Sequence, residues 1–224
     1  MRLPQRLIKF SFFLLYNHLA FSYDAIAWLV SLGQWADWRR SALSHLQPGP
    51  TLELAYGTGG LYVDMIKAGL QPIGIDVSPF MARLTSRKLR RAQLAGAIIR
   101  CQAQALPFPT GIFANAVATF PTNYIFEPET LSEVRRVLSD QSSKPGQLVV
   151  VVQGRLSGSG NIKRFIDWLY QITGQHETIV EEPLRRFKEA GFEATWKVGQ
   201  YDQASATLIV AHKIIQNHLV PDQL

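Results

Sequence analysis

The sequence comprises 224 residues, of which 47% are hydrophobic and 18% are charged, a composition typical of one folded domain with a sizeable core rather than of a disordered chain. Its single cysteine, Cys101, excludes an internal disulfide framework and a CxxC metal pair, and favours a reducing, cytoplasmic compartment. The formal net charge of +6 fits a nucleic acid partner, an anionic membrane surface or solubility alone.

The N-terminal segment begins with basic residues and continues with apolar ones. Arg2, Arg6 and Lys9 precede an uncharged run over residues 10–23. The order resembles a signal peptide, but no small-x-small cleavage site follows, and the run is shorter than the roughly 18–20 residues that cross a bilayer. Two interpretations stay open: helices packed on the domain, or an interfacial helix that makes peripheral membrane contact by dipping its aromatic side chains into the acyl boundary. A Gln-Pro-Gly-Pro sequence at residues 47–50 ends the segment.

Residues 52–60, Leu-Glu-Leu-Ala-Tyr-Gly-Thr-Gly-Gly, predict a buried strand that runs into a glycine turn, followed by a helix from Leu61. Glycines are needed in such a turn because the backbone adopts positive φ and a ligand approaches with no Cβ in the way. A dinucleotide-binding fingerprint would carry a third glycine where this chain has Tyr62, so NAD is disfavoured. We therefore expect a platform at this turn for a different ligand.

A second strand, predicted over residues 71–76, ends in Asp76. On a strand next to the first, this carboxylate would stand at the carboxyl end, face the glycine turn and accept both hydroxyls of a ribose. Glu53 places another acid inside the first strand. The two acids and the turn together predict a site for a ribose-containing ligand.

Strand and helix patterns alternate through most of the chain. This alternation predicts an α/β fold with a parallel, doubly wound sheet, and a ligand outside the carboxyl ends of the strands. The expected helices cover residues 60–68, 79–92, 128–138 and 183–190. The expected strands beyond the first two cover residues 97–101, 114–119, 147–152, 192–199 and 205–212. A Gly/Ser loop is expected over residues 154–160, and a helical stripe follows between Phe165 and Ile172.

Basic side chains gather on the helix that follows the second strand: Arg83, Arg87, Lys88, Arg90 and Arg91. A solvated helix face is the usual meaning of such a run, and an anionic partner is the alternative.

The glycine turn and the second strand resemble a known family. Residues 53–59, Glu-Leu-Ala-Tyr-Gly-Thr-Gly, resemble the first motif of class I S-adenosylmethionine-dependent methyltransferases, and residues 74–78, Gly-Ile-Asp-Val-Ser, resemble the second. Residues 104–108, Gln-Ala-Leu-Pro-Phe, followed by residues 113–117, resemble the third region. The match covers residues 51–152 and is close to the small-molecule branch that includes the quinone-ring methyltransferases.

The resemblance implies a particular architecture. It predicts a Rossmann-like, doubly wound, seven-stranded sheet in the order 3-2-1-4-5-7-6, whose last strand is antiparallel. It also predicts an N-terminal helical lid over residues 1–49, a methyltransferase domain over residues 50–214 and a C-terminal tail over residues 215–224. The cofactor that it implies is S-adenosyl-L-methionine, and no metal is expected.

The resemblance assigns several residues to the methionine end of that cofactor. Amides around Gly57 and Gly59 would bind the carboxylate at a helix start, and Glu53 would accept the ammonium. Tyr23 would lie over the methionine portion, and a role as a packing aromatic is an equal alternative. Ala55 stands where the family has its first glycine.

The nucleoside end is assigned in the same way. Asp76 would bind the ribose, and Val77 would cover one face of the adenine. Gln102, followed by Ala103, stands where the family has an acid that bonds the adenine amine, and its carbonyl can accept that bond without charge. Thr119, at the end of the fourth strand, completes the predicted set.

Three departures from the family pattern leave a further alternative open. Ala55 and Gln102 are two of them, and the third is Ala114, which stands where an aspartate often follows the phenylalanine. An inactive, cofactor-binding descendant of the family is therefore a second hypothesis.

A general base would assist a hydroxyl or ring acceptor. The sequence offers His18, Tyr124, Tyr170 and His176 in segments expected to line the acceptor pocket, and for each one a surface or packing role is the favoured interpretation. No base is assigned.

The fourth-strand region indicates the class of acceptor. Residues 120–124 read Phe-Pro-Thr-Asn-Tyr rather than the Asp/Asn-Pro-Pro-aromatic motif of amino-methylating nucleic-acid enzymes. Cys101 lies outside the position of a cytosine C5 nucleophile, and Glu127-Pro-Glu129 does not reproduce the acidic loop of protein arginine enzymes. A small hydrophobic acceptor, quinol- or lipid-like, is the favoured hypothesis. The alternative enzyme is an RNA methyltransferase that uses the basic helix; nucleic acid is the less favoured partner, and the sequence predicts no oligomeric state.

Overall fold

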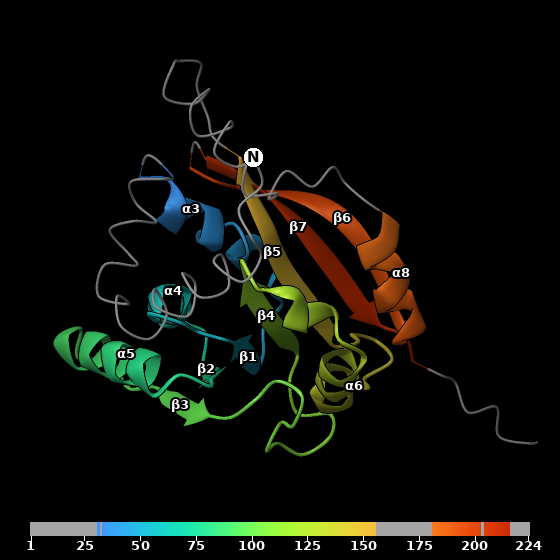
Figure 1. Cartoon of the computed structure of the whole chain (residues 1–224), viewed down its shortest axis with the longest axis horizontal. Helices are drawn as coiled ribbons and strands as arrows, with labels where there is room; N and C mark the ends of the chain where they lie inside the picture. The colour runs from blue at the N-terminus through green and yellow to red at the C-terminus, as the bar shows by residue number, and fades with distance from the viewer. Residues whose placement is uncertain (1–30, 32, 156–180, 203, 216–224) are drawn as a thin grey trace, which may run out of the picture.

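A sheet of seven strands organises the part of the chain that the structure describes. The structure is a computed structural model and describes residues 31, 33–155, 181–202 and 204–215 (Figure 1). Its strands are β1 (Thr51–Leu54), β2 (Pro72–Asp76), β3 (Ala97–Arg100), β4 (Asn115–Thr119), β5 (Gln147–Arg155), β6 (Phe192–Tyr201) and β7 (Ala204–Lys213).

The strand order is β3-β2-β1-β4-β5-β7-β6, which confirms the predicted order. The pairs among β1 to β5 are parallel, whereas β7 runs antiparallel to both β5 and β6. The reversed strand that the resemblance implied is therefore present. The carboxyl ends of β1, β2 and β4 consequently meet at one edge of the sheet.

Helices cover both faces of this sheet (Figure 1). They are α3 (Trp35–Arg40), α4 (Gly60–Lys67), α5 (Pro79–Arg91), α6 (Pro128–Val137) and α8 (Glu181–Glu189), with short 3₁₀ turns η1 (Leu43–His45) and η2 (Asn123–Phe126). α3 and α4 pack with one set of strand side chains, and α6 and α8 pack with the other set.

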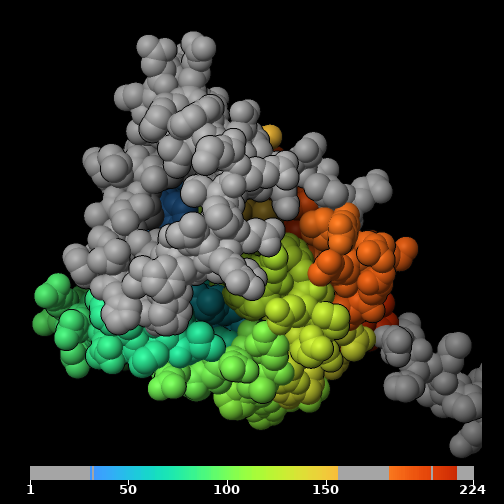
Figure 2. All heavy atoms as spheres, in the orientation of Figure 1, coloured from blue at the N-terminus to red at the C-terminus, as the bar shows by residue number. Residues whose placement is uncertain are grey.

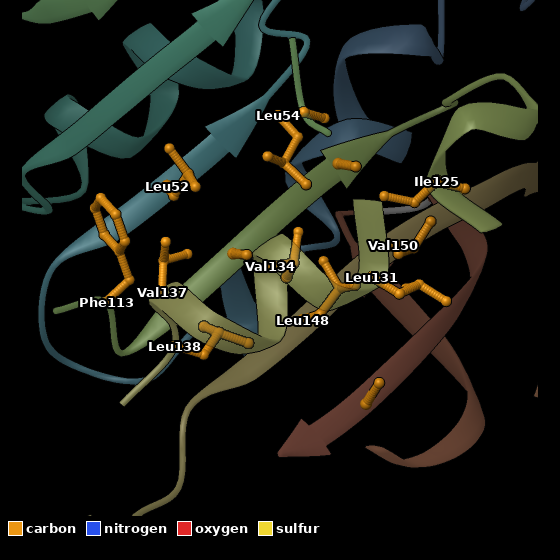
Figure 3. Close-up of a cluster of buried hydrophobic side chains, with 14 of the residues drawn as sticks. Leu52, Leu54, Phe113, Ile125, Leu131, Val134, Val137, Leu138, Leu148 and Val150 are labelled. Carbon is orange, nitrogen blue, oxygen red and sulfur yellow. The ribbon is translucent and has the colours of Figure 1, made fainter. Parts of the chain in front are cut away.

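Alternate residues of the central strands point into different cores. On β5, Leu148 and Val150 belong to the core under α6 and α8 (Figure 3), whereas Val149 and Val151 belong to the core under α3 and α4. Covered faces on both sides explain why this strand is continuously apolar, as predicted. The two cores hold the carboxyl ends of the strands in fixed positions.

β5 is longer than predicted. The strand was expected to end at residue 152, but it continues to Arg155, so the loop expected over residues 154–160 is wrong at its first two positions, and the rest of that loop lies outside the described residues. A Cβ built on Gly154 would overlap the ring of Trp38, and the Trp38 indole N–H donates to the Arg155 carbonyl at 3.2 Å. Gly154 therefore marks a close approach of α3 rather than a turn.

α5 presents its arginine residues to solvent. The helix buries Met81, Thr85 and Leu89 and exposes Arg83 and Arg87 along its outer side. Figure 2 shows α5 at the surface of the molecule. This placement agrees with the solvated-face interpretation. Among the described helices, none combines the length and the apolar character that a membrane span requires.

A buried polar network closes the amino-terminal edge of the sheet. Asn115, which has no exposed surface, accepts from the Gln47 N–H and the Gln147 amide, both at 2.9 Å. Its own amide group donates to the Gln47 carbonyl at 2.8 Å and to the Thr51 hydroxyl at 3.0 Å. This one amide side chain therefore attaches the segment before β1 to β4 and β5.

Asn115→Ala is expected to lower the free energy of unfolding by about 3 kcal/mol, because it leaves several buried polar groups without partners. Urea unfolding measures the change. The control, Asn123→Ala, alters an exposed amide and should stay within about 0.5 kcal/mol of the wild type. Equal effects of the two variants would contradict the structural role of Asn115.

Candidate functional site

The glycine turn lies at the carboxyl end of β1 and adopts the predicted conformation. Gly57 and Gly59 have φ values of 56° and 72°. Ala55 shares this left-handed conformation with a φ of 52°, although it carries a side chain. A non-glycine residue in that region costs on the order of 1 kcal/mol. Ala55 therefore adopts a backbone conformation that glycine would reach without this cost.

α5 supports the turn from behind. A Cβ built on Gly59 would lie 2.5 Å from the Thr85 methyl group, and the Thr85 hydroxyl donates to the Gly57 carbonyl at 2.9 Å. Gly59 is therefore required both by its φ and by the lack of space. The contact with Thr85 fixes the position of the glycine turn relative to α5.

Asp76 connects the end of β2 to the same turn. One carboxylate oxygen accepts from the Gly57 N–H at 2.9 Å, and the other accepts from the Ser78 N–H at 2.8 Å. Burial raises the pKa of Asp76, and the bonds from the backbone amides of Ser78, Gly57 and Val77 oppose that rise. The structure thus places Asp76 beside the turn, as predicted.

Glu53 is a buried acid inside β1, with only 2% of its surface exposed. Among the described residues, its Oε2 atom has no hydrogen-bond partner. Burial raises the pKa of Glu53 well above its usual value, and the positive charge of Arg39 opposes that rise. Buried polar atoms in proteins are nearly always paired, so this oxygen indicates a partner supplied by a ligand.

The remaining predicted contacts follow the same edge of the sheet. Val77 is 58% exposed, which is unusual for a valine and leaves an open apolar surface beside Asp76. Gln102 is exposed and Ala103 is buried in the loop after β3, the strand paired with β2. Thr119 ends β4, one residue beyond the pair between Leu54 and Ala118.

Tyr62 shows why a dinucleotide fingerprint does not form. Its ring is fully buried beneath the turn, and its hydroxyl lies 2.7 Å from the Pro72 carbonyl and 3.0 Å from the Ala97 carbonyl. A Cβ on Gly74 would lie 2.9 Å from the Tyr62 ring. The position that would hold a third glycine instead holds α4 away from β2 and β3.

The other predicted residues are less informative. Tyr124 lies in η2 and packs against the core under α6 and α8. His18, Tyr23, Tyr170 and His176 lie outside the described residues, so their predicted roles stay predictions.

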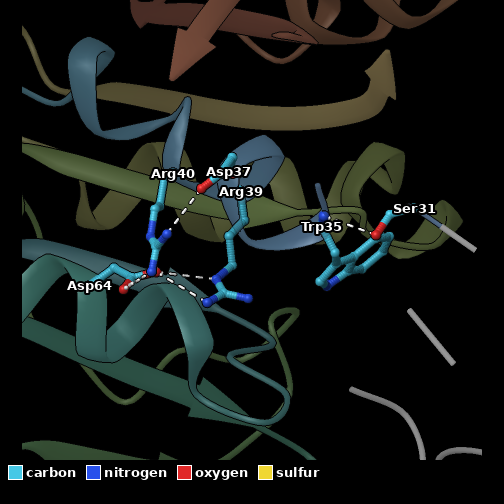
Figure 4. A network of polar contacts seen from close by, with 6 residues as sticks. All are labelled: Ser31, Trp35, Asp37, Arg39, Arg40 and Asp64. Carbon is cyan, nitrogen blue, oxygen red and sulfur yellow. Dashed lines mark hydrogen bonds and ion pairs between the residues drawn. The ribbon is translucent and has the colours of Figure 1, made fainter. Parts of the chain in front are cut away.

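The sequence analysis missed Arg39, whose guanidinium lies against the start of α4. A Cβ built on Gly60 would lie 2.6 Å from the Arg39 Cζ atom. Arg39 donates through Nε and Nη2 to Asp64 at 3.3 and 3.2 Å (Figure 4). The available signal was a basic pair, Arg39 and Arg40, ahead of a helix that carries a lone acid.

An aromatic pair flanks the same edge and was also missed. Phe120, directly after Thr119, has a φ of 49° and stacks on Trp35 with ring centroids 4.2 Å apart. A strained non-glycine residue persists only where its surroundings enforce it, and such residues gather at functional sites.

Comparison with known proteins agrees with this geometry. A family model described as "Methyltransferase domain" matches residues 51–141. The demethylmenaquinone methyltransferase of Thermus thermophilus is 32% identical over 146 residues, which are 62% of this chain and 64% of that protein. The ubiquinone/menaquinone biosynthesis C-methyltransferase UbiE of Geobacter sulfurreducens is 27% identical over 165 residues, 70% of this chain and 62% of that protein. The chain thus spans slightly less than two thirds of these relatives.

Solved structures show the same fold. A SAM-dependent methyltransferase of Thermotoga maritima has a TM-score of 0.56 and 19% identity, covering 83% of this chain and 92% of that one. The geranyl diphosphate C-methyltransferase of Streptomyces coelicolor has a TM-score of 0.56 and 15% identity, covering 80% and 78%.

The glycine turn with its two acids, the strand order and the matched family model agree with one another. Residues 51–141 match a methyltransferase domain, the chain has the fold of S-adenosylmethionine-dependent methyltransferases, and its sequence is similar to that of the demethylmenaquinone methyltransferases.

Proposed function

We propose that this protein binds S-adenosylmethionine across the carboxyl ends of β1 and β2 and methylates a small hydrophobic, quinol-like acceptor. The observation that carries the proposal is the Oε2 oxygen of Glu53, which is buried beside a glycine turn that Asp76 holds in place and has no partner within the described part of the chain. A cationic ligand group is the partner that such an oxygen fits, because burial of an isolated charge is costly.

The residues at the methionine end fit the group. Glu53 accepts the ammonium, and the carboxylate lies at the start of α4, whose dipole favours an anion. The amides of Gly57 and Gly59 themselves donate to Asp76 and to the Tyr56 carbonyl, so these two glycines shape the turn rather than bind the carboxylate. Ala55 presents only a methyl group at the turn. The same proposal includes Tyr23 as a contact of the methionine portion of the cofactor.

The residues at the nucleoside end fit it as well. Each Asp76 oxygen already accepts one backbone amide and keeps a lone pair for a ribose hydroxyl. Val77 provides an apolar face for the adenine, Gln102 offers a carbonyl to the adenine amine, and Ala103 borders the ring. Thr119, at the end of β4, belongs to the same proposed cofactor site.

Methyl transfer requires the protein mainly to position the acceptor next to the cofactor. The cofactor, when bound, supplies a methyl group on an activated sulfonium leaving group. The chain's task is to hold the acceptor near attack distance, where effective molarity contributes roughly 7–11 kcal/mol. A planar acceptor ring would find an aromatic wall in the stacked pair of Trp35 and Phe120.

The acceptor class rests on the comparisons, since relatives of this chain are named as menaquinone and ubiquinone methyltransferases. An apolar acceptor of that kind partitions into lipid, so the proposal includes work at a membrane surface through the N-terminal segment. In the same proposal, residues 1–49 form the lid, residues 50–214 the methyltransferase domain and residues 215–224 the tail.

The direct test supplies labelled S-adenosylmethionine and a demethylmenaquinol to the purified protein, with RNA and protein fractions as parallel acceptors. Label that enters the quinol supports the proposal. Label confined to RNA or protein overturns the acceptor, and absence of transfer in all fractions, despite cofactor binding, indicates an inactive descendant.

Asp76→Asn is expected to weaken binding of S-adenosylhomocysteine by about ten- to a hundredfold. The amide nitrogen cannot accept from one of the two backbone N–H groups, and charge-assisted bonds are worth about 1.5–3 kcal/mol. Calorimetric titration measures the affinity. Asp202→Asn makes the same change at the turn between β6 and β7 and should leave binding unaltered. Unaltered binding in Asp76→Asn would contradict the ribose assignment.

Glu53→Gln is expected to raise stability while weakening cofactor affinity. Burial raises the pKa of Glu53 above the ordinary value of 4.5, so the folded state holds a proton that the unfolded state has lost. Stability of the wild type is therefore full below about pH 4.5 and falls as the pH rises toward the folded pKa, by up to about 1.4 kcal/mol per pH unit.

Denaturant unfolding between pH 5 and 8 checks this sign. The advantage of Glu53→Gln over the wild type should grow with pH, whereas Glu193→Gln, which changes an exposed acid on β6, should show no such trend. A stability difference that is constant with pH would refute the buried-proton explanation.

A further inference from the structure

We propose that Arg39 binds the carboxylate of the cofactor's amino acid portion, and that Arg39 and Glu53 together form a site for an α-amino acid zwitterion. The inference rests on the proposed function and extends it to a residue on α3, outside the strand ends and the glycine turn. It explains why an arginine lies at the start of a helix.

Gly60 leaves the space that Arg39 occupies. A Cβ at this position would lie 2.6 Å from Cζ and 2.8 Å from both Nε and Nη1 of Arg39. Gly60 is the first residue of α4 and has no positive φ, so its backbone does not require glycine. Glycine inside a helix costs roughly 0.5–1 kcal/mol relative to alanine. The missing side chain therefore serves the close approach of the guanidinium.

The position of Arg39 is electrostatically unfavourable without an anion. The amino-terminal end of a helix carries partial positive charge, so a guanidinium there is repelled rather than attracted. Asp64 offsets part of this repulsion, since it accepts from Nε and Nη2 of Arg39 and also from Arg40. Among the described residues, the Nη1 atom of Arg39 has no recorded acceptor. One N–H face of the guanidinium thus stays available beside the turn.

Glu53 provides the independent observation that a ligand belongs here. It is 2% exposed, and its Oε2 atom has no partner within the described part of the chain. Arg39 is the positive charge that acts most strongly on this carboxyl, yet its ion pair is with Asp64. A carboxyl without a partner and a guanidinium that influences it but does not bind it are the groups that an ammonium and a carboxylate on one carbon require.

Arg40 offers a matched comparison within the same cluster. It donates to Asp64 through Nε and Nη2 and to Asp37 through Nη1, so its guanidinium is occupied (Figure 4). It also lies over the ring of Tyr201, away from the turn. Loss of Arg40 removes a bond to Asp64 but removes no donor that faces the site.

The test measures the affinity of the full chain for three nucleosides by calorimetry. S-adenosylhomocysteine carries the whole amino acid, decarboxylated S-adenosylmethionine keeps the amine alone, and 5′-methylthioadenosine has neither group. Arg39→Met should weaken S-adenosylhomocysteine by about ten- to a hundredfold, as loss of a charge-assisted bond does, and should change the other two less than about twofold. Arg40→Met should leave the ratio among the three ligands unchanged. Glu53→Gln should weaken both amine-bearing ligands and spare 5′-methylthioadenosine.

Gly60→Ala supplies a second variant in case Arg39→Met fails to fold. Its methyl group displaces the guanidinium while improving helix propensity, so S-adenosylhomocysteine should weaken selectively without loss of thermal stability. Equal weakening of all three ligands by Arg39→Met, or no weakening at all, overturns the inference. If the wild type binds none of the three, the proposed function itself fails.

Discussion

The hydrogen bond from the Gly57 amide to the Asp76 carboxylate joins the ends of β1 and β2 at the point where both strands leave the sheet. Everything at the site is arranged around this link. Asp76 also accepts from the amide of Ser78, the residue directly before α5. The Thr85 hydroxyl on α5 donates to the Gly57 carbonyl and so supports the glycine turn. The acid, the turn and the helix thus form one closed loop of contacts, so the site has a fixed shape before any ligand arrives.

This fixed shape is maintained against several unfavourable terms. Ala55 and Phe120 occupy left-handed backbone conformations at the ends of the adjacent strands β1 and β4, and the Oε2 atom of Glu53, buried within β1, has no hydrogen-bond partner among the described residues. The stabilising contacts lie elsewhere, in the two apolar cores on either side of β4 and β5. Strain and unpaired polarity are therefore concentrated at one edge of the sheet, as expected where binding energy is to be gained.

Most of the fold could be predicted from the sequence because its signals are local. Glycine and proline residues at turns, together with the apolar runs, predicted the strands and helices to within a few residues. The resemblance to the family predicted the strand order. The prediction failed at β5, because Gly154 looks like a loop residue until Trp38, far away in the sequence, is placed against it. The site residues could be predicted only where the signal was local. Asp76 and the glycines belong to short motifs, whereas Arg39 reaches the turn only through tertiary contacts with Gly60 and Asp64.

The packing of Trp38 against Gly154 restricts which substitutions these two positions accept. The indole replaces a side chain on the strand and also binds the Arg155 carbonyl, so the two positions share a single volume. A smaller residue at 38 would open a void that a larger residue at 154 could fill, but neither exchange is tolerable alone. Ancestral or redesigned variants should therefore change Trp38 and Gly154 together. A change at only one of the two positions would indicate that α3 packs on the sheet in a different position.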